Sequence, residues 1–306
     1  MSDDVRQPLS PEVVAQTRAS LARIDTSARE AEQLVGRLMQ LPVVQRSMEL
    51  RRAGATPARC ANLALDLLSL PAEEWHARLV ALTPRQQRKA LQRIVAASAA
   101  LACNEPHRAH RLTGSILQIV RHDRLPQRAT FVRHQLAGRA LLVRARALIT
   151  LHAYADALTA IAEARAALPR GDSYDRYRMH AQLLRGQVLA ATGHASDALQ
   201  TFTVCAQFAI DQIDAHALVD ALASTAVLLC AHSEYGTALT AIALATRVAR
   251  SAGNETLLAT LQASLVECAF LTARSSMHDP SGDRIREAHG PCECVGPHAF
   301  ECPWAS

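Results

Sequence analysis

Residues 154–164 read YADALTAIAEA, and this pattern returns twice farther along the 306-residue chain. It returns 41 residues later as ASDALQTFTVC, at 195–205, and 40 residues after that as YGTALTAIALA, at 235–245. Alanine, the strongest helix former, is the commonest residue in these segments, and no segment of the chain alternates as a strand would. Self-similarity at a period of about 40 residues is typical of proteins built from stacked supersecondary units. The repeat therefore predicts an all-α fold.

The same register extends into the segment before each copy. A small residue stands three positions before a leucine and twelve positions before an alanine of the copy. The small residues are Ala145, Gly186 and Ala226, and the leucines are Leu148, Leu189 and Leu229. Two antiparallel helices pack closely only if small side chains lie where they cross. A hairpin of this kind cannot bury its apolar face alone, so we expect neighbouring hairpins to stack and share a core.

This register resembles the tetratricopeptide repeat over roughly residues 130–252. The first unit matches best, through Ala145, Leu148, Tyr154, Ala157, Ile161, Ala164 and Pro169. Three features depart from the family: the period is 40 to 41 residues instead of about 34, the second unit has Ala195 where an aromatic residue is usual, and the closing proline occurs only in the first unit. The resemblance implies a right-handed α-solenoid whose concave groove binds peptides or partner helices.

Capping residues and prolines divide the chain further. Ser10 and Pro11 predict a helix that runs to about Ile24, and a second helix is expected over 27–39. We expect three regions: an N-terminal helical region, the tetratricopeptide-like repeats and a tail without fixed structure. Their bounds are 1–103, 104–274 and 275–306.

The net charge of +5 conceals two opposite blocks. Residues 82–146 carry 13 basic residues and the acids Glu105 and Asp123, a net +11, whereas residues 147–306 carry 10 basic and 16 acidic residues, a net −6. Such a basic block attracts acidic peptides, phosphates or nucleic acid. The alternatives are a solvated face and pairing with the acidic repeats of the same chain.

Five arginines of one predicted helix are the candidate partner-binding residues. At 100° per residue, Arg128, Arg139 and Arg146 fall on one face, and Arg133 and Arg144 form a second stripe. Arginine binds carboxylates through two parallel hydrogen bonds, so an acidic segment of a partner protein is the expected ligand. Nucleic acid is disfavoured, because this block has a single aromatic residue to stack on bases.

The tail contains one candidate metal site. Cys292, Cys294, His298 and Cys302 supply four soft ligands within 11 residues, as zinc requires. The one-residue spacer between the first two cysteines is unusual for zinc, and a flexible tail with free thiols is the alternative interpretation. No phosphate-binding loop, HExxH pair or nucleophile elbow occurs, so we expect no cofactor and no enzymatic activity.

We therefore expect a non-catalytic scaffold or adaptor that holds a partner protein. A regulatory sensor that works with a transcription or signalling apparatus is the alternative, and head-to-tail association of basic and acidic ends would give a homo-oligomer. The first residues lack the pattern of a secretory signal, and no apolar run is long enough to span a membrane, so the cytoplasm is the expected location. Buried free thiols are expected at Cys60, Cys103, Cys205, Cys230 and Cys268.

Overall fold

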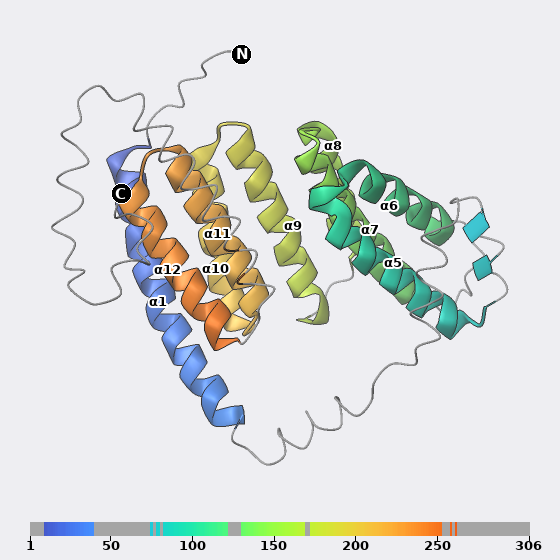
Figure 1. Ribbon diagram of the computed structural model, residues 1–306, viewed down its shortest axis with the longest axis horizontal. Coiled ribbons are helices and arrows are strands. Elements are labelled where there is room, and N and C mark those ends of the chain that lie inside the picture. Colours follow the sequence, from blue (N-terminus) through green and yellow to red (C-terminus); the bar gives the residue numbers. More distant parts are fainter. Residues whose placement is uncertain are drawn as a thin grey trace, which may run out of the picture.

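The computed structural model describes residues 9–39, 74–75, 78–79, 82–121, 130–168, 172–252, 258 and 261. These residues form helices joined by short turns, with no strand among them, which confirms the all-α prediction (Figure 1). The helices are α1 (Pro11–Met39), α5 (Pro84–Asn104), α6 (Pro106–Arg121), α7 (Thr130–Thr150), α8 (Tyr154–Ala167), α9 (Asp172–Ala191), α10 (Ala195–Asp211), α11 (Ala215–Ala231) and α12 (Tyr235–Ser251).

Local capping explains where α5 begins and why α1 does not break. Thr83 caps α5 in a reciprocal capping box with Gln86. The predicted break after Ile24 is wrong, because α1 continues to Met39 as one helix. Thr26, inside the expected gap, lies within the helix and donates its hydroxyl to the carbonyl of Ala22 at 3.1 Å.

Three turns of the repeat share one backbone conformation. Each contains a residue with a left-handed φ of +58° to +86°, namely His152, Gly193 and Ser233. The next residue donates its N–H to the carbonyl of the register leucine, at 2.9 Å in all three turns. The pattern closes a helix C-terminus and reverses the chain, which makes a hairpin. The hairpins are α7–α8, α9–α10 and α11–α12.

Close packing within each hairpin follows the register of small residues. A Cβ atom added to Gly186 would lie 2.6 Å from a ring carbon of Phe202, so only glycine fits there. Ala145 and Ala226, the equivalent residues, are fully buried. The prediction that small residues lie at the helix crossings is confirmed at Gly186, and the burial of Ala145 and Ala226 agrees with it.

Buried apolar residues form two clusters that meet at α9. The first cluster joins α5, α6, α7 and α8 with Trp75 and Leu79, and the second joins α1, α10, α11 and α12. Helix α9 contributes Leu184 and Val188 to the first cluster and Met179 and Leu183 to the second. One helix therefore connects two halves of the molecule.

Helix α1 packs far along the chain from its own position in the sequence. It contacts α10 and α12, whereas α5 contacts α6 and α7. Leu21, Ile24 and Ala28 bury one face of α1 in the second cluster. The boundary expected at residue 103 falls in the last turn of α5 and stays a prediction.

Two further expectations concern the cysteines and the membrane. Cys205 and Cys230 are buried free thiols, as expected, but Cys103 is exposed because it lies in the last turn of α5. Cys60 and Cys268 lie outside the described residues. Within the described part of the chain, every helix is too short or too polar to cross a bilayer.

Candidate functional site

Helices α5, α6 and α7 are unusual in their charge. They carry eleven basic residues and no acid. Arg108 and Arg121 form ion pairs, with Glu105 at 3.0 Å and Glu163 at 3.2 Å. Eight others have no carboxylate within 4 Å in the described structure: Arg85, Arg88, Lys89, Arg93, Arg111, Arg139, Arg144 and Arg146. We call these eight the unpaired cations.

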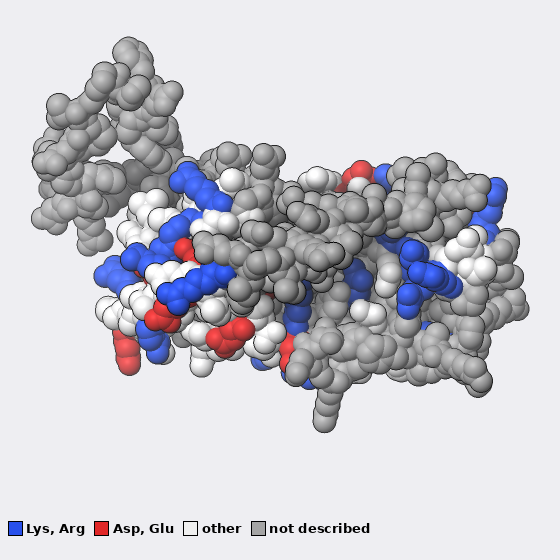
Figure 2. All heavy atoms as spheres, turned by 90° about the horizontal axis from the view of Figure 1, so that it is seen from below, with Lys and Arg blue, Asp and Glu red and all other residues white. Residues whose placement is uncertain are grey.

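Several unpaired cations are half-buried instead of extending into solvent. Lys89, Arg93, Arg139, Arg144 and Arg146 all belong to this class. One guanidinium nitrogen of Arg93 is buried without a hydrogen-bond partner among the described residues. A buried charge without a partner is costly, so an anion that reached these side chains would be favoured. Figure 2 shows the contrast, with blue side chains largely alone on the side of α5–α7 and mixed with red ones around α1 and α12.

The five predicted arginines do not share one location. Arg139 lies over the ring of Tyr177 on α9, with 5.4 Å between Cζ and the ring centroid. Arg146 is close enough to α9 and α11 to shift the pKa of His180 and Asp220. Arg144 instead acts on His110 of α6. Arg133 is half-buried and has an interaction partner, and Arg128 lies outside the described residues.

Arg139 and Arg146 belong to a polar face that runs across the first helices of the three hairpins. Arg139, His180 and Asp220 each stand six positions before the small residue of their hairpin. Residues at equivalent positions lie on equivalent faces, and α9 contacts both α7 and α11. Gln187 of α9 donates to Ser224 of α11 at 3.2 Å and continues the contact between the helices. We call this surface the first-helix face: Arg139, Arg146, Tyr177, His180, Gln187, Asp220 and Ser224.

Burial dominates the electrostatics of the first-helix face. Burial lowers the pKa of His180 to about 4, and the charges of Arg146 and Arg176 lower it further, against the effect of Asp214. Burial also raises the pKa of Asp220, although Arg146 and His216 act in the opposite direction. His180 is therefore neutral at pH 7 and can both donate and accept a hydrogen bond.

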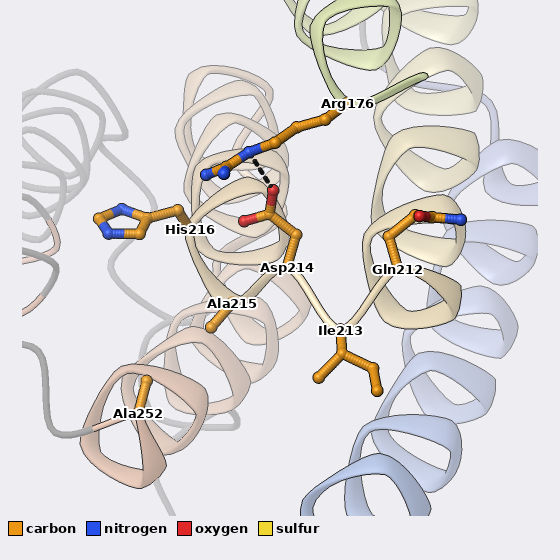
Figure 3. A pocket seen from close by; sticks show the side chains of 7 residues that line it. All are labelled: Arg176, Gln212, Ile213, Asp214, Ala215, His216 and Ala252. Carbon is orange, nitrogen blue, oxygen red and sulfur yellow. Dashed lines mark ion pairs between the residues drawn. The ribbon is translucent and has the colours of Figure 1, made fainter. Parts of the chain in front are cut away.

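A pocket of about 320 Å³ lies beside this face, at the turn between α10 and α11 (Figure 3). Arg176 reaches from α9 to Asp214 and pairs with it at 2.6 Å. The second oxygen of Asp214 accepts the N–H of Ala217 at 3.2 Å and caps α11. Asp214 thus holds the turn through one ion pair and one capping hydrogen bond. Ile213, also in the pocket wall, has a left-handed φ of +53°.

Metal binding finds no support within the described residues, where no group of three or more histidine, cysteine or acidic side chains gathers. The zinc candidates Cys292, Cys294, His298 and Cys302 lie outside the described residues. Tyr177, His180 and Asp220 were not predicted from the sequence. Counting six positions back from each small residue of the register would have found His180 and Asp220.

Comparison with other proteins does not add to this description. No protein-family model, curated protein or solved structure matches the chain.

Proposed function

We propose that the chain is a non-catalytic scaffold, a tetratricopeptide-like solenoid that holds an acidic segment of a partner protein against the first-helix face. The observation that carries the proposal is that Arg139 and Arg146 of α7, the two half-buried unpaired cations of this face, have no carboxylate within 4 Å in the described structure. A carboxylate of the partner would form an ion pair with these side chains, and the two parallel hydrogen bonds of arginine would orient the carboxylate.

The spacing of Arg139 and Arg146 on α7 restricts the distance between the acidic residues of the ligand. Arg139 and Arg146 are seven residues apart, which is about 10 Å along a helix. Carboxylates about 10 Å apart occur three residues apart in an extended polyproline-II segment, which rises about 3.1 Å per residue. We therefore expect a segment with two acidic residues three positions apart. Tyr177, beside Arg139, offers a ring face for an apolar neighbour of the first acid.

Selection from a random peptide library on the immobilised chain tests this proposal. We expect enrichment of peptides with two acids three residues apart, and affinity that falls as salt rises. The double variant Arg139→Gln, Arg146→Gln should weaken these peptides at least tenfold. The matched control is Arg85→Gln, Arg88→Gln, which removes two exposed unpaired cations of α5. Enrichment without acids, or equal loss in both double variants, would refute the role of the first-helix face.

A further inference from the structure

Helices α8, α10 and α12 are the second helices of the three hairpins, and α6 comes before them in the chain. We call each successive pair in this series, α6 with α8, α8 with α10 and α10 with α12, a step, and the three steps differ. Between α6 and α8, Arg121 pairs with Glu163 at 3.2 Å and bridges the two helices. Between α10 and α12, α1 packs against both helices. Between α8 and α10, Leu158 is 42% exposed and Val204 is 61% exposed. The middle step therefore exposes apolar side chains that no described helix covers.

These two residues are the repeat equivalents of residues that α1 helps to cover. Leu158 corresponds to Leu199 of α10, 41 positions later, and Val204 corresponds to Leu244 of α12, 40 positions later. Leu199 is 2% exposed and Leu244 is 4% exposed, and both belong to the apolar cluster that includes Leu21 of α1. The α8–α10 step thus resembles the α10–α12 step with its covering helix removed.

Polar contacts define the direction in which α1 runs along α10 and α12. Near the start of α12, Arg18 donates to the hydroxyl of Thr237 at 2.7 Å and pairs with Glu234 at 3.5 Å. Near the end of α12, Arg247 pairs with Asp25 and with Glu32. Helix α1 therefore runs parallel to α12 and carries a base first and acids later.

The exposed step has the same order of charges. Asp197, in the first turn of α10, occupies the position equivalent to Thr237 and lies near the start of the step. Arg165, in the last turn of α8, lies toward its end. Both side chains are exposed, and neither has an ion-pair partner in the described structure. A helix that runs parallel to α10 would meet an acid first and a base later, as α1 does on α12.

We propose that the α8–α10 step binds an amphipathic helix of a partner protein whose residue order resembles that of α1. Its apolar side chains, spaced three and four residues apart, cover Leu158 and Val204. A basic residue near its start pairs with Asp197, and an acidic residue two to three turns later pairs with Arg165. This site lies on the second helices, so it is independent of the first-helix face.

A labelled synthetic peptide with the sequence of residues 11–32 provides the probe, because it carries the required pattern. Fluorescence anisotropy with the full chain should show saturable binding, and the helix content of the peptide should rise. The double variant Leu158→Asp, Val204→Asp should weaken binding at least tenfold. Leu239→Asp is the matched control, because Leu239 is the equivalent leucine of α12 and is 56% exposed. All three leucine and valine positions are exposed, so the variants should fold, which circular dichroism checks.

Charge reversal distinguishes peptide binding at the α8–α10 step from binding in place of α1 at the α10–α12 step. Arg165→Glu should weaken the peptide, and a peptide with Asp25→Arg should recover the affinity for that variant. Absence of binding at millimolar peptide would overturn the proposal. The proposal would also be overturned if the affinity were unchanged in the double variant Leu158→Asp, Val204→Asp but lost in Arg247→Glu. The peptide would then occupy the α10–α12 step.

Discussion

The two halves of the molecule share a helical architecture but differ in how they satisfy their charges. Around the second cluster, four of the nine basic residues of α1, α9 and α12 pair with carboxylates, namely Arg18, Arg29, Arg176 and Arg247. In the half around the first cluster, eight of the eleven basic residues of α5–α7 are unpaired cations. A larger share of the basic residues is therefore paired with carboxylates around the second cluster than on α5–α7, where most of the cations are open to a partner.

The length of the arginine and lysine side chains lowers the free-energy cost of leaving these cations unpaired. Arginine and lysine can bury their methylene groups while the charged end stays near water. Half-buried cations on α5 and α7 are consistent with this arrangement, and so is the ring of Tyr177 beneath Arg139. The difference between the halves leads to predictions in which similar substitutions have unlike effects.

The largest expected effect concerns His180, on the helix that joins the halves. Its folded-state pKa of about 4 is lower than the ordinary value of 6.5, so the unfolded chain binds the proton more readily. Stability is therefore lost as pH falls from about 6.5 to about 4, by about 3 kcal/mol from this group. Urea denaturation of His180→Gln between pH 7 and pH 4 should show a correspondingly smaller loss than the wild type.

Two controls accompany this measurement. The substitution His134→Gln, at an exposed position of α7, controls for the removal of one histidine. Asp220→Asn tests a shift of the opposite sign. Because burial raises the pKa of Asp220, protonation of this carboxylate on acidification favours the folded state. The Asn variant should therefore lose more stability than the wild type as the pH falls. An unchanged pH profile in His180→Gln would show that α9 does not bury this ring between the charges of both halves.

A paired substitution tests the contrast between the halves directly. Arg247→Met leaves Glu32 without its cation and Asp25 with Arg29 alone, in a site where the side chains of Arg247, Asp25 and Glu32 are each about one-third exposed. We expect a loss of about 2 kcal/mol, less than the 3–5 kcal/mol for a fully buried pair. Arg139→Met removes an unpaired cation and its contact with Tyr177, so the change should stay within about 1 kcal/mol. Equal losses in chemical denaturation would refute the contrast.

The sequence predicted the parts of this structure that depend on local pattern. The spacing of Ala145, Gly186 and Ala226 predicted buried small residues in the three hairpins and the close contact at Gly186, because the two helices of a hairpin are neighbours in the sequence. It did not predict where α1 docks, since Arg18 and Thr237 are 219 residues apart and no periodicity relates them. It placed Arg139 and Arg146 on one face, but His180 and Asp220 join them only through the stacking of α7, α9 and α11.

The smallest expected effect concerns Ile213, in the turn that Asp214 holds by its two contacts. A left-handed φ is unfavourable for a β-branched residue by about 1–2 kcal/mol, and Ile213 is half-exposed, so its side chain contributes little burial in return. Glycine adopts this conformation without that cost but is more flexible in the unfolded chain. Ile213→Gly should therefore raise the free energy of unfolding by about 1 kcal/mol, whereas Ile213→Val, which is also β-branched, should leave it unchanged.

A second variant tests whether the Arg176–Asp214 ion pair holds this turn in its strained form. If it does, Ile213→Gly should stabilise the Asp214→Ala variant less than the wild type, because the turn of that variant is free to relax. Equal stabilisation in both backgrounds, measured as a double-mutant cycle, would separate the strain at Ile213 from the Arg176–Asp214 pair.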